Sequence, residues 1–105
     1  MPLLNQLLPE FSEEIKLLLV EAGELRLAEQ ISDLKIVDRC RCGDSFCATF
    51  YTAPIPQPSY GPTHRNVALD PEAGIVILDV EGEEIKCVEV LYRDEIRAKL
   101  HALVP

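Results

Sequence analysis

Apolar residues recur at helical spacing in the first third of the chain. They run from Ser12, a natural N-cap, to Ser32, and Gly23 divides them, since glycine is the usual residue just past a helix end. The apolar positions are Ile15, Leu18, Leu19, Ala22, Leu25, Leu27, Ala28 and Ile31. We predict a helical hairpin over residues 12–32. The leucines before it fit two alternatives, one helical turn packed on the body or an arm over residues 1–11.

Residues 34–52 have the pattern of a β-hairpin. Residues 43–45, Gly-Asp-Ser, are a turn signal between two runs of strand-forming residues. A loop centred on this turn places Cys42 opposite Cys47. The next pairs are Cys40 with Thr49 and Asp38 with Tyr51. Side chains alternate along a strand, so one face is expected to carry Ile36, Asp38, Cys40, Cys42, Cys47, Thr49 and Tyr51. Three of the four cysteines therefore share a face.

Residues 74–92 have the pattern of a second hairpin, with Glu81 and Gly82 as its two-residue loop. With Val80 opposite Glu83, one face carries Val76, Leu78, Val80, Ile85, Cys87 and Leu91, and the other carries Ile75, Ile77, Lys86, Val88, Val90 and Tyr92. Both faces are then apolar, which is typical of a sheet covered on both sides. The short helices offer too little surface to cover both, so we predict a C2 homodimer that buries part of the sheet.

The remaining segments complete the predicted fold. Prolines at positions 54, 56, 58 and 62 exclude a helix or a central strand, so we expect one long proline-rich loop over residues 53–70. Residues 93–103 have an amphipathic pattern that predicts a last helix. The prediction is a single α+β domain over residues 1–105. It has an N-terminal helical hairpin, a four-stranded antiparallel meander made of two β-hairpins, and a C-terminal helix, with the helices on one face.

Composition narrows the classes of function. The chain has 105 residues and a net charge of -8, which argues against nucleic-acid binding because that needs a basic surface. No apolar run of about 18 residues occurs, so we expect no membrane span. The first residues lack the features of a signal peptide. The expected location is the cytoplasm, where cysteines are free thiols or metal ligands.

The first candidate site binds zinc. Its ligands would be Cys40, Cys42 and Cys47, with Cys87 or His64 as the fourth. Residues two apart on a regular strand are separated by about 6.5 Å, which is farther than two thiolates on one zinc ion. This site therefore requires the strand to bulge or to end before Gly43. The alternative is that the cysteines pack as small apolar residues in the core.

Two other roles of the cysteines stay open. Cys42 and Cys47 face each other, as a cross-strand redox pair would, and nearby arginines favour a thiolate. A Cys–His enzyme would need Cys40 or Cys47 beside His64 as the base, with Asp38 orienting it. The common catalytic motifs do not occur in the sequence, so the expectation leans away from an enzyme.

A basic cluster is the remaining candidate. It consists of Lys35, Arg39, Arg41 and Arg65, and guanidinium groups suit carboxylate and phosphate ligands. Tyr60 and His64, on the long loop, complete this candidate ligand-binding set. The alternative is that the arginines neutralise acidic neighbours on a solvated face.

The sequence thus leads to three hypotheses. The first is a small, acidic, non-enzymatic homodimer of the cytosol that binds a protein partner or a small ligand such as an anion. The second is a zinc-binding protein that uses Cys40, Cys42, Cys47 and Cys87. The third is a Cys–His thiol enzyme or a redox protein.

Overall fold

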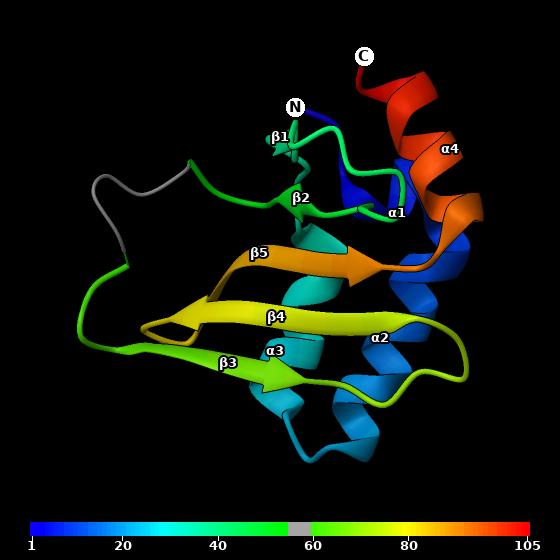
Figure 1. The fold of residues 1–105 in the computed structure, drawn as a ribbon. Coiled ribbons are helices and arrows are strands. Elements are labelled where there is room, and N and C mark those ends of the chain that lie inside the picture. The colour runs from blue at the N-terminus through cyan, green and yellow to red at the C-terminus, as the bar shows by residue number, and fades with distance from the viewer. Residues whose placement is uncertain (55–59) are drawn as a thin grey trace.

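Helices and strands form two layers (Figure 1), and the broad α+β class is confirmed. The structure is a computed structural model that describes residues 1–54 and 60–105. The helices are α1 (Leu4–Leu7), α2 (Pro9–Glu21), α3 (Leu25–Gln30), a 3₁₀ turn η1 (Ile31–Asp33) and α4 (Asp94–Leu103). The strands are β1 (Asp38–Arg39), β2 (Phe50–Tyr51), β3 (His64–Ala68), β4 (Ile75–Glu81) and β5 (Glu84–Leu91). Figure 1 shows α2 and α3 behind the sheet, with α4 and α1 at one end.

The N-terminal region forms the predicted pair of helices. Gly23 lies between α2 and α3 with a φ of +77°, the left-handed conformation that ends many helices. α2 begins at Pro9, earlier than Ser12, because proline suits the first position of a helix. α1 is the packed turn of the two alternatives: Leu4 and Leu8 are buried, and the backbone N–H of Leu4 donates to the carbonyl of Leu34 at 2.7 Å.

The first β-hairpin has the predicted register. Asp38 pairs with Tyr51, and the N–H of Cys40 donates to the carbonyl of Thr49 at 2.8 Å. Phe50 points to the opposite face, where it is fully buried and meets Phe11 of α2 edge to face, with ring centroids 6.3 Å apart. The hairpin is therefore attached to the helical layer through an aromatic pair.

The prediction of a four-stranded meander is wrong in two respects. The sheet has five strands in the order β1-β2-β5-β4-β3, and β3 lies inside the segment 53–70 that the prolines indicated as loop. The chain also does not meander, because β2 pairs with β5 and the connection from β2 leads to the far edge of the sheet. The prolines end before β3 begins, so they do not prevent it from forming. Two of them, Pro56 and Pro58, lie in residues 55–59, which are outside the described residues.

The second hairpin contains a β-bulge that the sequence pattern did not reveal. Its turn is Gly82 and Glu83, both with positive φ, one residue later than predicted. Val80 then pairs with Ile85 but Asp79 pairs with Cys87, which leaves Lys86 as an extra residue on β5. Every residue of β5 beyond the bulge lies on the opposite face from the one that we predicted.

The bulge gathers the apolar residues of β4 and β5 on the helix side. Val76, Leu78, Val80, Ile85, Val88 and Val90 are all at most 3% exposed. The other face carries Ile75, Ile77, Asp79, Cys87, Glu89 and Leu91. This face is mixed, with four apolar residues and two carboxyl groups, so it is less apolar than we expected, and the fully apolar face is covered within a single chain. The argument that led to a homodimer loses its basis.

The Phe11–Phe50 contact provides a test of how the hairpin is attached. Phe50→Ala would leave a cavity between β2 and α2, and we expect the free energy of unfolding to fall by about 3–5 kcal/mol. Phe46→Ala is the control, because Phe46 is 40% exposed; its cost should stay below about 1.5 kcal/mol. Urea unfolding followed by circular dichroism measures both. Equal costs would show that Phe50 does not hold the layers together.

Candidate metal centre

Three cysteine side chains meet beside the first hairpin. The sulfur atoms of Cys40, Cys42 and Cys47 all lie within 4.8 Å of one another, and all three cysteines are free thiols. They could hold a metal ion, because thiolates on a single zinc ion are about 3.8 Å apart and a small side-chain rotation closes the difference. Cys42 is exposed and Cys47 is only 9% exposed, so the group reaches from the surface to the edge of the core.

The end of β1 makes this grouping feasible. β1 stops at Arg39, so Cys40 and Cys42 are not held at the spacing of a regular strand. Gly43 has a φ of +82°, a conformation that side chains disfavour, and it returns the chain toward Cys47. The condition that the sequence set for a C-x-C pair, a strand end before Gly43, is met.

Hydrogen bonds among the three thiols shift the pKa values of Cys42 and Cys47. A backbone hydrogen bond from Asp44 lowers the pKa of Cys42, but hydrogen bonds with the Cys47 and Cys40 sulfurs outweigh it and raise this pKa to about 11. Burial raises the pKa of Cys47, yet hydrogen bonds from Thr49 and from the two other thiols bring it below the ordinary value. Cys47 therefore becomes a thiolate more readily than Cys42, and binding of a metal would release the remaining protons.

A hollow of about 510 Å³ opens beside the thiols, on the sheet face away from α2 and α3. Its lining residues are Cys40, Asp44, Phe46, Cys47, Thr49, Tyr51, Tyr60, Asp79, Cys87, Glu89 and Leu91. Asp79, Glu89 and Tyr51 were not among the candidates from the sequence. Asp79 carried a signal, because it is a carboxylate inside the apolar run ILDV, and such residues often belong to sites.

Cys87 lines this hollow but does not join the thiol group. Within residues 1–54 and 60–105, the ligand atoms that lie within 4.8 Å of one another at this site are the sulfurs of Cys40, Cys42 and Cys47, without that of Cys87. It lies directly across the ladder from Asp79 and is 3% exposed. Burial and the charges of Asp79 and Glu89 raise its pKa, so it is a poor thiolate. The structure does not bring the predicted fourth ligand to the other three.

His64 is held by other partners. Its Nε2 lies 2.8 Å from Oδ1 of Asp79, and the ring of Tyr60 stacks on it with centroids 4.5 Å apart. Asp79 pairs with Cys87, whereas Cys47 pairs with Leu91, four residues farther along β5. The backbones of Cys87 and Leu91 are separated by about 13 Å along the strand. The Cys47–His64 pair that the enzyme hypothesis requires is therefore not assembled.

The predicted basic cluster is also not assembled. Arg65 lies on β3 at the far edge and binds both carboxylate oxygens of Glu24 at 2.9 and 3.0 Å. Arg41 pairs with Asp38 at 2.8 Å, and Nε of Arg39 donates to the carbonyl of Val104 at 2.7 Å. These contacts correct the expectation of one anion pocket shared by the arginines.

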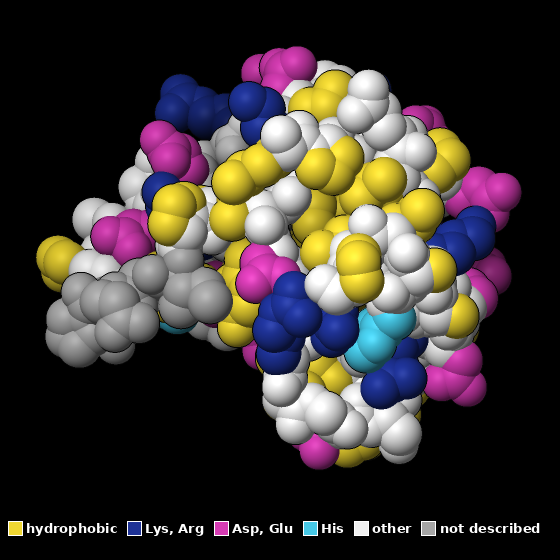
Figure 2. Space-filling model, turned by 90° about the horizontal axis from the view of Figure 1, so that it is seen from above, with side chains coloured by type: hydrophobic (Ala, Val, Ile, Leu, Met, Phe, Trp, Pro, Cys, Tyr) yellow, Lys and Arg dark blue, Asp and Glu magenta, His cyan; other side chains and the backbone are white. Residues whose placement is uncertain are grey.

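Two of the predicted basic residues instead adjoin the last helix. Arg39 and Arg41, with Arg97 of α4, are near enough to His101 that desolvation and their charges lower its pKa. Figure 2 shows basic side chains around a histidine on the side of the molecule that carries both termini. This group is a surface patch, since Arg41 is exposed and His101 is only half-buried.

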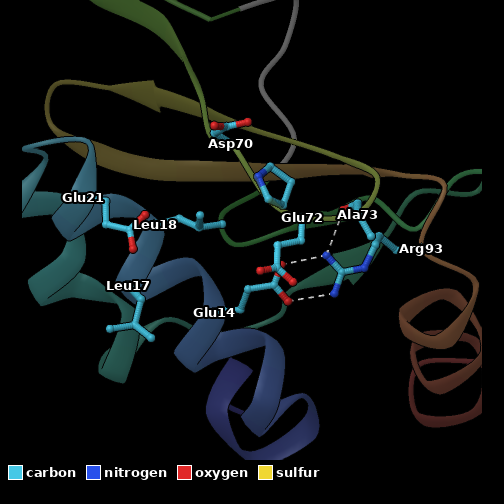
Figure 3. Close-up of a pocket in the computed structure, with 9 residues that line it drawn as sticks. Glu14, Leu17, Leu18, Glu21, Asp70, Glu72, Ala73 and Arg93 are labelled. Carbon is cyan, nitrogen blue, oxygen red and sulfur yellow. Dashed lines mark hydrogen bonds and ion pairs between the residues drawn. The ribbon is translucent and has the colours of Figure 1, made fainter.

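A second hollow, of about 430 Å³, lies between α2 and the segment before β4 (Figure 3). Both carboxylate oxygens of Glu14 bind the guanidinium of Arg93 at 2.7 Å, and Arg93 also donates to the carbonyl of Ala73 at 3.2 Å. The same guanidinium lies over the Phe11 ring, 5.4 Å from its centroid. Arg93 therefore joins α2 to the end of the sheet, and this hollow is a structural junction.

Comparison of the chain with protein-family models, with curated proteins and with solved structures finds no match. No helix in the described part of the chain is long and apolar enough to cross a membrane.

The carboxylate pair in the hollow predicts a pH dependence of stability. Burial, and then the hydrogen bond and charge of Asp79, raise the pKa of Glu89 to about 7 from an ordinary 4.5. The native state thus keeps a proton that the unfolded chain releases, so this group's contribution to the free energy of unfolding is full below pH 4.5 and falls as the pH rises to about 7.

Glu89→Gln removes this titration. In metal-free protein, the difference in unfolding free energy between Glu89→Gln and the unmodified chain should grow in favour of the variant between pH 4.5 and 7 and then level off. Urea titrations at several pH values measure it. Two parallel curves across this range would contradict the burial of a shared proton.

Proposed function

We propose that the protein binds one zinc ion through the thiolates of Cys40, Cys42 and Cys47. The proposal depends on one observation, the gathering of three sulfur atoms within 4.8 Å at a strand end. Thiolates bind zinc in preference to magnesium or calcium, which prefer oxygen ligands. Three protein ligands are enough for a zinc centre that keeps one position for another group. Free thiols of this kind fit a reducing compartment such as the cytosol.

The hairpin supports the proposal because it is preorganised. The register of β1 with β2 and the hydrogen bond between Cys40 and Thr49 fix where the cysteine-bearing segment begins and ends. Cys47 is further fixed by its bridge to Leu91 of β5. A metal ion would therefore order only the short segment around Cys42 and Gly43, at a small entropic cost.

Metal analysis of the purified full chain tests the proposal. We expect native mass spectrometry to show one zinc ion per chain, and Cys42→Ser to weaken zinc binding by more than about a hundredfold, since loss of outer partners alone costs 10–100-fold. Cys42 is exposed, so its replacement leaves the core intact. Cys87→Ser is the matched control and should keep the metal. Equal zinc content in both variants, or none in the unmodified protein, would refute the site.

A second candidate function is self-association through a different surface from the one predicted. Phe46 and Tyr92 stack with ring centroids 5.4 Å apart, and they are 40% and 61% exposed. Tyr92 has a φ of +61°, which is costly for a bulky residue, and its N–H donates to the carbonyl of Phe46 at 2.9 Å. With Ile75, 41% exposed, they supply an apolar patch for a symmetric dimer.

Tyr92→Gly tests this second function, because glycine removes the ring and also suits the positive φ. Light scattering over a range of concentrations should show a dimer for the unmodified chain and a monomer for the variant. A monomer in both cases would remove self-association and would leave the zinc proposal untouched.

A further inference from the structure

The thiol group lies at one end of the 510 Å³ hollow. Cys40 and Cys47 line the hollow, and Asp79 and Glu89 line it as well. Among the described residues, no further His, Cys, Asp or Glu ligand atom joins the three sulfurs within 4.8 Å. A tetrahedral ion held by these three thiolates would keep one position without a side chain, and the hollow is the space beside it.

We propose that this fourth position is open to the hollow and takes an exchangeable small ligand with a neutral nitrogen donor, an amine or an imidazole. The inference deepens the proposed zinc function and rests on it. A closed structural site needs four protein ligands, and the one remaining thiol, Cys87, lies across the ladder from Asp79, outside the group.

Charge selects the class of ligand. Three thiolates on a divalent ion give a net charge of -1, and the wall of the hollow adds the carboxyl groups of Asp79 and Glu89. The described residues that line the hollow include no Lys or Arg. An anionic ligand would be repelled by the negative metal centre and would find no cationic side chain in the wall, whereas a neutral donor that carries N–H groups would bind the metal and donate to the carboxyl oxygens.

The wall is also shaped for such a ligand. Asp79 is 8% exposed and is held by His64 at 2.8 Å, so its free oxygen has a fixed direction. Tyr60 is positioned by its stack on His64 and by the adjoining Gly61, whose N–H donates to Oε2 of Glu81 at 3.0 Å. Tyr51 and Tyr60 add aromatic surface, on which a flat, neutral ring such as imidazole can stack.

Cobalt-substituted full-length protein tests the inference. The d–d absorption of tetrahedral Co²⁺ reports its fourth ligand, and the sulfur-to-cobalt bands report the thiolates. We expect imidazole to change the d–d bands in a saturable way while the sulfur bands persist. Acetate at the same ionic strength should bind about tenfold more weakly, a difference of about 1.4 kcal/mol. Glu89→Gln should reduce this discrimination and keep the cobalt affinity.

The outcomes separate the two proposals. Stoichiometric cobalt with d–d bands that imidazole does not change would show a closed centre and would overturn the inference alone. Loss of about a quarter of the sulfur-band intensity in Cys87→Ser would also overturn it, by showing four thiolate ligands. Equal binding of acetate would refute the choice of ligand class. Failure of the unmodified protein to bind cobalt or zinc would remove the proposed function together with the inference.

Discussion

Lys86 is an extra residue in β5 that has no partner in β4, and it forms a β-bulge. This bulge determines which side chains form the core and which form the site. Before the bulge, Ile85 faces the helices; after it, Val88 and Val90 do. Strict alternation would have sent both valines to the open face and Cys87 into the core. A bulge re-aims the side chains that follow it, and here it separates a wholly apolar face from a mixed one that carries Asp79 and Glu89.

The same bulge determines the composition of the hollow. Because Asp79 and Cys87 are paired on the open face, Tyr51 of β2 meets Cys87 across the next ladder. Glu89 follows on the same side, where burial and the neighbouring Asp79 raise its pKa. The first hairpin adds its thiols because Phe50 and Tyr51 continue the sheet beyond β5. Carboxyl groups from one hairpin and thiols from the other therefore face a common space that neither hairpin forms alone.

The parts that the sequence predicted are those governed by local chemistry. The turn at residues 43–45 and the alternation around it were enough to give the register that pairs Asp38 with Tyr51. The predicted register of the second hairpin was wrong because the sequence EIKCVEVL contains no marker of a bulge. Either set of alternating positions in this run includes apolar residues. The prolines before β3 led us to assign its residues to a loop, although Val67 is buried between the exposed residues Asn66 and Ala68.

The predicted sites also show this difference between local and long-range determinants. Three cysteines close together in sequence on one hairpin did meet, because only a turn separates them. Arg39 and Arg65 did not, because strand order places β1 and β3 at opposite edges, and strand order depends on long-range pairing that no local pattern contains. The His64–Asp79 contact was missed for the same reason. Proximity across a sheet depends on the register of both strands, and here that register includes the turn at Gly82 and the bulge.

The thiol centre is not needed to hold the fold together, and this bears on its role. Small zinc domains that depend on the metal have little core of their own, so loss of the ion unfolds them. Here β2 is attached through Phe50 to Phe11 and to Val88, and all three side chains are at most 4% exposed. A metal ion at Cys42 would tie down an exposed turn and would add little to that core. The metal centre that we propose would therefore be better suited to bind and exchange ligands at the mouth of the hollow than to stabilise the chain.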